Sequence, residues 1–141
     1  MNWLLDTCVI SEPTKRSPEP RVIQWLAAQP EETCFLSVLT LGELRKGASK
    51  LPRGPRRSAL EHWLETELRL RFAGRILSID ESVAFTWGQM QAALSRPVPA
   101  IDSLIAATAL AHNLTVVTRN TPDMALTGAI CFNPWDPVHA D

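Results

Sequence analysis

Four acidic residues are the side chains of this sequence best suited to chemistry: Asp6, Glu43, Asp102 and Asp123. Each lies beside a segment expected to be a strand or a helix of an open α/β sheet, so all four can face one pocket. Carboxylates at close range repel one another and raise one another's pKa, so such a cluster requires a cation. Mg²⁺ and Mn²⁺ suit sites made of oxygen ligands and bridge protein carboxylates to substrate phosphates. The acids therefore point to metal-assisted cleavage of a phosphodiester.

The first two acids also have structural explanations. Asp6 follows the apolar run Trp3–Leu5 and could cap the turn after it, although a carboxylate at the end of a buried strand is costly to desolvate without a partner. Glu43 could pair with Lys46 on an exposed helix face, an interaction worth only about 0.2–0.5 kcal/mol. Both explanations leave a role in catalysis open.

The other two acids resemble helix-capping residues. Asp102 could cap a helix that begins at Ser103, and capping does not prevent metal binding. The segment Thr121–Asp123 fits a cap, a first-turn proline and a first-turn acid, which the helix dipole favours. For Asp123 taken alone, this structural explanation is the stronger one.

Polar residues next to the acids are candidates for supporting roles. Thr7 and Thr118 could orient a carboxylate or bind metal-bound water, although threonine is also common at strand ends. Arg119 could neutralise the acids or hold a phosphate, or it could be an exposed turn residue. Residues 44–60 hold six basic residues and no acid, and are either a surface for nucleic-acid phosphates or a solvated loop between helices.

The composition fits one ordinary domain, residues 1–141, with 45% apolar and 21% charged residues and a net charge of −1. No apolar stretch approaches the ~20 residues of a membrane span, and no basic, signal-like segment opens the sequence. The three cysteines are widely spaced and unpaired in sequence, which favours reduced thiols and disfavours a zinc site. We therefore expect a cytoplasmic protein with no membrane partner.

Apolar runs and helical periodicity alternate along the sequence. Strands are expected at residues 3–6, 33–37, 76–79, 114–118 and 129–132, and helices at 21–29, 38–49, 59–72, 82–95 and 101–112. This alternation predicts an α/β fold with a parallel, doubly wound sheet. Ligands bind beyond the carboxyl ends of strands in such sheets, where Asp6 and the turn at residues 118–120 would both lie.

Four segments resemble the signatures of PIN-domain toxins, in the same order along the chain. They are residues 4–12 (LLDTCVISE), 39–47 (LTLGELRKG), 101–109 (IDSLIAATA) and 115–123 (TVVTRNTPD). The segment FNPW at 132–135 is also similar to the ending of the FitB-like branch of the VapC family. One such motif is weak evidence, but four in order are specific.

The resemblance implies a three-layer α/β/α sandwich with a central parallel sheet. It also implies a Mg²⁺- or Mn²⁺-dependent endoribonuclease that is the toxin of a type II toxin–antitoxin pair. Such toxins are usually homodimers. A cognate antitoxin inhibits them, and they bind operator DNA only through that antitoxin. By position, Asp6, Glu43 and Asp102 match the family's metal-binding acids, and Asp123 matches the fourth.

The sequence departs from the family pattern at three positions. Cys8 replaces the usual Asn, which removes an amide near the site. Asn120 stands where FitB-like relatives often have Asp, so the fourth acidic position lies at either Asn120 or Asp123. Met124 replaces a frequent Phe, which we expect to alter packing only.

Three other functions compete with the nuclease. A haloacid-dehalogenase-type phosphatase requires an acid at position 8, where Cys8 cannot serve, and a receiver domain requires a late lysine that the turn at 118–120 lacks. A catalytically silent PIN-fold module that binds RNA or antitoxin is disfavoured by the four intact acids.

The apolar residues Leu60, Trp63 and Leu64 are candidates to form a dimer or to receive an antitoxin helix.

Overall fold

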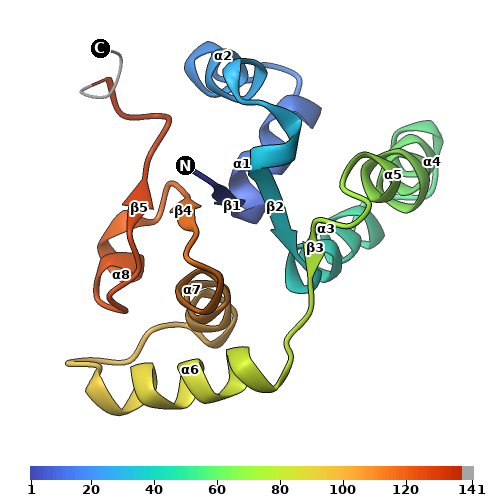
Figure 1. The fold of residues 1–141 in the computed structure, drawn as a ribbon. Coiled ribbons are helices and arrows are strands. Elements are labelled where there is room, and N and C mark those ends of the chain that lie inside the picture. The colour runs from blue at the N-terminus through green and yellow to red at the C-terminus, as the bar shows by residue number, and fades with distance from the viewer. Residues whose placement is uncertain (138–141) are drawn as a thin grey trace.

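Five short strands form one parallel sheet in the computed structural model, which describes residues 1–137. They are β1 (Trp3–Leu5), β2 (Cys34–Ser37), β3 (Ile76–Leu77), β4 (Thr115–Val117) and β5 (Cys131–Phe132). The strand order is β3-β2-β1-β4-β5, and every neighbouring pair is parallel (Figure 1). The predicted parallel α/β fold is confirmed, and β1 is the central strand.

Helices connect successive strands, as parallel pairing requires. They are α1 (Thr7–Ser11), α2 (Pro20–Ala28), α3 (Val38–Ser49), α4 (Pro55–His62), α5 (Arg69–Arg71), α6 (Glu81–Ala93), α7 (Ala100–His112) and α8 (Thr121–Ala125). Single turns η1 (Glu12–Thr14) and η2 (Glu31–Thr33) and the π-helical turn η3 (Trp63–Leu68) complete the described chain. Within residues 1–137, no helix has the length and apolar character needed to cross a membrane.

The sheet buries both of its faces because neighbouring residues of a strand point to opposite sides. Leu4 and Val116 pack on one side with residues of α6, α7 and α8. Leu5 and Val117 pack on the other side with residues of α1, α2 and η3. Figure 1 shows the two helical layers on either side of the sheet, which confirms the predicted three-layer sandwich.

Some elements differ from the predictions. Helix α1 follows β1 directly and was not predicted, whereas the helix expected at 59–72 begins at Pro55 and contains the π-helical turn. The strands expected at 76–79 and 129–132 are only two residues long each. The three cysteines are free thiols, as expected. These differences add one short helix and shift the bounds of other elements. The strands that position the acids follow one another along the chain in the predicted order and are parallel, as predicted.

Candidate active site

Asp6 lies immediately after the central strand, at its carboxyl end. Its backbone N–H extends the ladder by donating to the Val117 carbonyl at 2.9 Å. Its side chain caps α1: Oδ1 accepts from the Thr7 N–H at 2.8 Å, and Oδ2 accepts from Thr118 Oγ1 at 2.7 Å. The residue is only 7% exposed. Burial raises the pKa of Asp6 and the charge of Glu43 adds to this, while the hydrogen bonds from Thr118 and Thr7 oppose it.

Thr7 joins Asp6 to the acid of the neighbouring helix. Its hydroxyl Oγ1 donates to Glu43 Oε1 at 2.6 Å. Glu43 is presented by α3, which starts directly after β2 because Ser37 caps it by accepting from the Leu39 N–H at 3.1 Å. The alternative pairing of Glu43 with Lys46 is not seen within residues 1–137. Glu43 thus faces the same site as Asp6.

Asn120 joins the remaining two acids. Its amide Nδ2 donates to Asp102 Oδ2 and to Asp123 Oδ2, at 3.2 Å each. Its backbone N–H donates to Thr118 Oγ1 at 3.0 Å, and that hydroxyl in turn donates to Asp6. One hydrogen-bonded network, here the carboxylate network, therefore joins Glu43, Thr7, Asp6, Thr118, Asn120, Asp102 and Asp123.

The capping explanation for Asp102 is wrong, whereas Asp123 does lie in the first turn of α8, as expected. Pro99 holds the capping position of α7, so Asp102 lies inside its first turn. Asn120, and not Thr121, holds the capping position of α8, although its side chain makes no capping hydrogen bond. Burial raises the pKa of Asp102, as do the charges of Asp6, Glu43 and Asp123, while the hydrogen bond from Asn120 lowers it.

Asp123 has a different electrostatic environment. Its Oδ1 lies 3.0 Å from Arg96 Nη2, and the Asn120 amide and the Arg96 guanidinium together lower the pKa of Asp123. Arg96 was missed in the sequence, because it lies in the α6–α7 connection, 27 residues from its partner. Its one local signal is a basic residue in the short loop before Asp102.

Arg119 is an exposed residue of the turn after β4, the second of the two alternatives for it. Its guanidinium packs over the Trp135 ring, 5.2 Å from the centroid. Within residues 1–137, Arg119 forms no ion pair with any of the four acids. The protein cation beside the carboxylate network is therefore Arg96.

The donor set fits a hard divalent cation in an open site. Within the described residues, no three His, Cys, Asp or Glu side chains form a ready-made metal site. Mg²⁺ keeps several waters and binds one or two carboxylates together with substrate phosphates, so it does not require a closed cage. Burial raises the pKa values of Asp6 and Asp102, and so does repulsion from Glu43 at Asp6 and from the other three acids at Asp102, a repulsion that a cation would relieve.

Known proteins resemble the chain along nearly its full length. A family model described as "PIN domain" matches residues 3–122. The chain is 42% identical over 135 residues to Toxin FitB of Neisseria gonorrhoeae, covering 94% of this chain and 97% of that protein. It is 38% identical over 138 residues to VapC ribonuclease Y4jK of Sinorhizobium fredii, covering 96% and 99%. A solved structure of FitAB bound to an IR36 DNA fragment has a TM-score of 0.93 at 38% identity and covers 99% of both chains.

Proposed function

Because the chain belongs to the PIN-domain family, and within it to the VapC toxins similar to FitB, we propose that it is a metal-dependent endoribonuclease. It acts as the toxin of a type II toxin–antitoxin pair in the cytoplasm, and residues 1–141 form a single PIN domain. The carboxylate network supports this proposal most directly, because it gathers four acids at the carboxyl ends of β1 and β4. PIN nucleases are metal-dependent, and this donor set suits Mg²⁺ or Mn²⁺.

In this proposal Asp6 and Asp102 hold the ion, and Glu43 and Asp123 complete the acidic site. When bound, the ion lowers the pKa of a water molecule and stabilises charge on the scissile phosphate. Thr7 and Thr118 fix the Asp6 carboxylate by donating to both of its oxygens. The network thereby orients these oxygens before substrate arrives, so little reorganisation is needed during the reaction.

Asn120 and Arg96 have supporting roles. The Asn120 amide donates hydrogen bonds to both Asp102 and Asp123 and so lies between their carboxylates. Of the two candidates for the fourth acidic position, Asp123 is therefore the one that supplies the acid. Arg96 keeps Asp123 ionised by pairing with it. Arg119 is exposed and packs on Trp135, next to the site, where it could still meet a substrate phosphate.

The partners follow the same family argument. Leu60, Trp63 and Leu64 line a hollow of about 120 Å³ together with Leu44 and Ala48, a surface suited to an apolar face of an antitoxin helix. The FitAB complex is bound to a DNA fragment, which supports DNA binding by a toxin–antitoxin complex of this chain, and we propose that operator DNA is reached through the antitoxin only. We also expect a homodimer, which light scattering coupled to size exclusion tests directly.

A cleavage assay with antitoxin-free protein tests the function. A mixed RNA panel is incubated with Mg²⁺, Mn²⁺ or EDTA, beside the Asp102→Asn variant. We expect discrete cuts that depend on metal and vanish in the variant. Equal cleavage in EDTA or by Asp102→Asn would refute the metal mechanism. Mn²⁺ binding by calorimetry without any cleavage would favour the silent binding module.

A further inference from the structure

The basic segment at residues 44–60 divides into a neutralised part and an uncompensated part. Arg45 pairs with Glu61 at 3.0 Å and with Glu65 at 2.7 Å, and Arg57 pairs with Glu61 at 3.6 Å. These two arginines and two glutamates balance one another. The other four basic residues are exposed and form no ion pair within residues 1–137: Lys46, Lys50, Arg53 and Arg56. We name these four residues the α3 strip.

The α3 strip begins on the helix face that presents Glu43. Residues three, four and seven positions apart share one face of a helix, so Lys46 and Lys50 lie on the Glu43 side of α3. Ala48, five residues after Glu43, lies on the buried side of the same helix. At 1.5 Å per residue, the two lysines lie about 4.5 and about 10.5 Å along the axis from Glu43. The cations therefore lead away from the carboxylate network.

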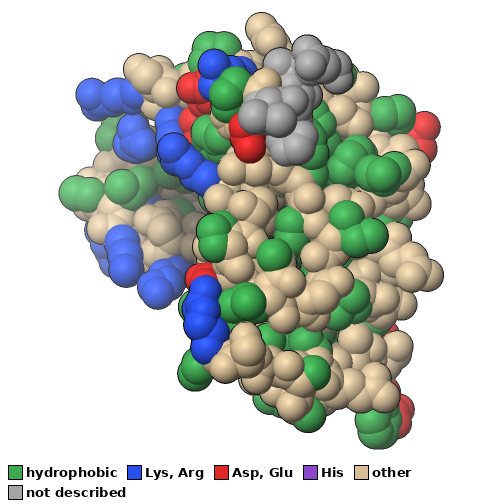
Figure 2. All heavy atoms as spheres, turned by 90° about the vertical axis from the view of Figure 1, so that its left-hand side faces the viewer, with side chains coloured by type: hydrophobic (Ala, Val, Ile, Leu, Met, Phe, Trp, Pro, Cys, Tyr) green, Lys and Arg blue, Asp and Glu red, His purple; other side chains and the backbone are tan. Residues whose placement is uncertain are grey.

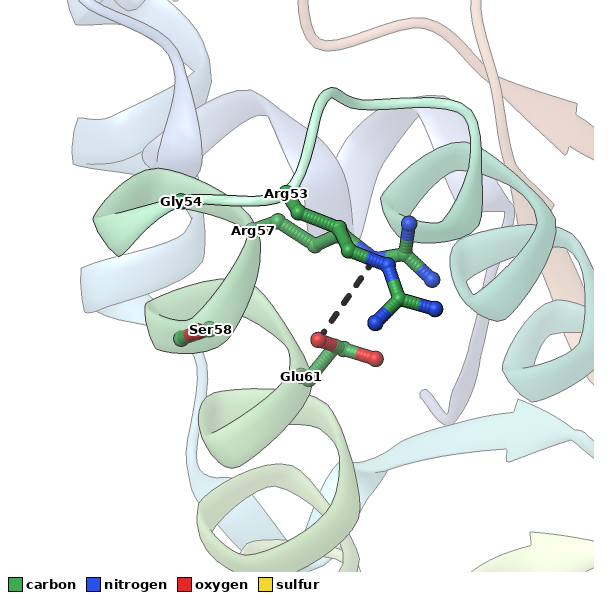
Figure 3. Close-up of a pocket in the computed structure, with 5 residues that line it drawn as sticks. All are labelled: Arg53, Gly54, Arg57, Ser58 and Glu61. Carbon is green, nitrogen blue, oxygen red and sulfur yellow. Dashed lines mark ion pairs between the residues drawn. The ribbon is translucent and has the colours of Figure 1, made fainter.

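The strip continues past the end of α3. Arg53 lies beside Arg57 at a hollow of about 290 Å³, which Gly54, Ser58 and Glu61 also line. Figure 3 shows the two guanidinium groups close together, with Arg57 held by Glu61 and Arg53 unpaired. The four cations of the strip fall within eleven residues, so positive charge is concentrated over a limited part of the surface. Figure 2 shows Lys and Arg side chains along one edge of the face on the left-hand side of Figure 1.

We infer that the α3 strip binds the phosphates of single-stranded RNA that flank the phosphate being cut. This inference rests on the proposed function, which places the scissile phosphate at the carboxylate network. A single strand leaving that network along α3 would place successive phosphates over Lys46, Lys50 and Arg53. Unpaired cations are free to replace the counterions of a phosphate backbone, which paired ones such as Arg45 are not. The strip also offsets the repulsion that the acids exert on an incoming polyanion.

Binding measurements on a matched pair of variants test the inference. A fluorescein-labelled oligouridylate is titrated by anisotropy with Asp102→Asn protein, which prevents cleavage, at several salt concentrations. Adding Lys46→Gln and Lys50→Gln should weaken RNA binding roughly 10-fold. The slope of log K, the association constant, against log salt concentration should fall in magnitude by about 1.4, which is about 0.7 for each lost phosphate contact. The control is Arg69→Gln on α5, an exposed residue without an ion pair inside residues 1–137, which should change neither.

Steady-state cleavage by the otherwise intact protein separates this inference from the proposed function. The double lysine variant should raise KM and leave kcat unchanged, because it removes binding contacts remote from the reacting phosphate. An unchanged affinity and salt slope, or an equal loss with Arg69→Gln, would overturn the inference even if RNA is cut. Weakened binding of an acidic protein partner with unchanged RNA affinity would also overturn it. If RNA binding depends on the two lysines but no RNA is cut with Mg²⁺ or Mn²⁺, the proposed nuclease function would be refuted. The inference that the α3 strip binds RNA would then stand.

Discussion

The two ends of the carboxylate network differ in how their charge is compensated. Asp6 is buried at the end of the central strand, and burial raises its pKa although two hydrogen bonds oppose the effect. The Asp123 side chain is 27% exposed, and Arg96 and Asn120 lower its pKa. Within residues 1–137, the fold therefore supplies a paired cation at the exposed end and none at the buried end. We conclude that Asp6 and its neighbour Asp102 have the greater need for a metal ion.

The difference follows from the elements that carry the acids. Asp6 is fixed between β1 and α1, so its carboxylate cannot move to relieve its desolvation. Asp123 lies on α8, a helix of five residues, within reach of the α6–α7 connection. Rigidity at one end and a compensating cation at the other suggest different roles. In the proposed mechanism Asp6 and Asp102 hold the ion, and Asp123 positions Asn120 and tunes the charge of the site.

Replacement of Asp6 should have the largest effect. Asp6→Asn should reduce cleavage about 10³-fold or more, because a bound metal ion contributes several kcal/mol of transition-state stabilisation. The Asn oxygen still accepts a hydrogen bond, so far-ultraviolet circular dichroism should show an intact fold. Asp123→Asn is the matched control and should lose much less activity. Equal losses for the two variants would contradict the proposed division of roles.

The pH dependence of stability should have opposite signs at the two ends. The pKa of Asp6 is raised above 3.8, so its contribution to folding is complete below that pH and is lost as pH rises through the folded-state pKa. The pKa of Asp123 is lowered, so its contribution is present above 3.8 and is lost as pH falls through the folded-state pKa. Urea unfolding without metal measures both.

Two variants isolate these contributions. Asp6→Asn should gain stability relative to the unsubstituted protein as pH rises toward neutrality, because it removes a buried charge. Asp123→Asn should lose stability relative to it as pH rises through the lowered folded-state pKa of Asp123 toward 3.8, and the deficit should stay constant above that pH. Parallel pH profiles for the two variants would show that burial and the Arg96 ion pair do not distinguish the two carboxylates.

The sheet was predictable because its strands are short apolar runs separated by helical patterns. Helix α1 was not predictable from propensity: its five residues include the β-branched Val9 and Ile10, and Asp6 and core packing impose the helix. The π-helical turn inside the predicted helix at 59–72 was likewise invisible, since apolar spacing does not specify such a turn. Local patterns therefore gave the layers but not every element between them.

The same limit applies to the candidate site. The four acids could be selected because each adjoins a predicted element, and the structure brings them into one network. Arg96 could not be selected, because its pairing with Asp123 depends on where two separate loops meet in space. Arg119 was selected by its nearness to Asp123 in sequence, but the turn directs its side chain to Trp135. Tertiary placement decides which cation serves the acids.

Removal of the Arg96 cation should have a smaller effect and should make the two ends more alike. Arg96→Gln should tighten Mn²⁺ binding by a factor of about 3 at low salt, because it removes a positive charge next to the acids. The gain should shrink at high salt, since the pair is exposed to solvent. Stability should change little, because an exposed ion pair contributes little to folding. Arg96→Lys is the charge-retaining control, and calorimetry that shows weaker Mn²⁺ binding by Arg96→Gln would contradict the assignment.

Replacement of Cys8, which lies next to the buried Asp6, should have the smallest effect on metal affinity. Its Sγ lies 4.0 Å from both Asp6 Oδ2 and Thr118 Oγ1, and a thiol is a weak donor. Cys8→Asn adds an amide that can donate to the Asp6 carboxylate and so favours its ionised form. Because that carboxylate already accepts from Thr7 and Thr118, Mn²⁺ affinity near pH 6 should rise only about twofold, near the lower limit for one net hydrogen bond. Cys8→Ala removes the thiol without adding a donor, so an equal rise in that variant would show that desolvation by the sulfur, and not a missing hydrogen bond, limits the buried end.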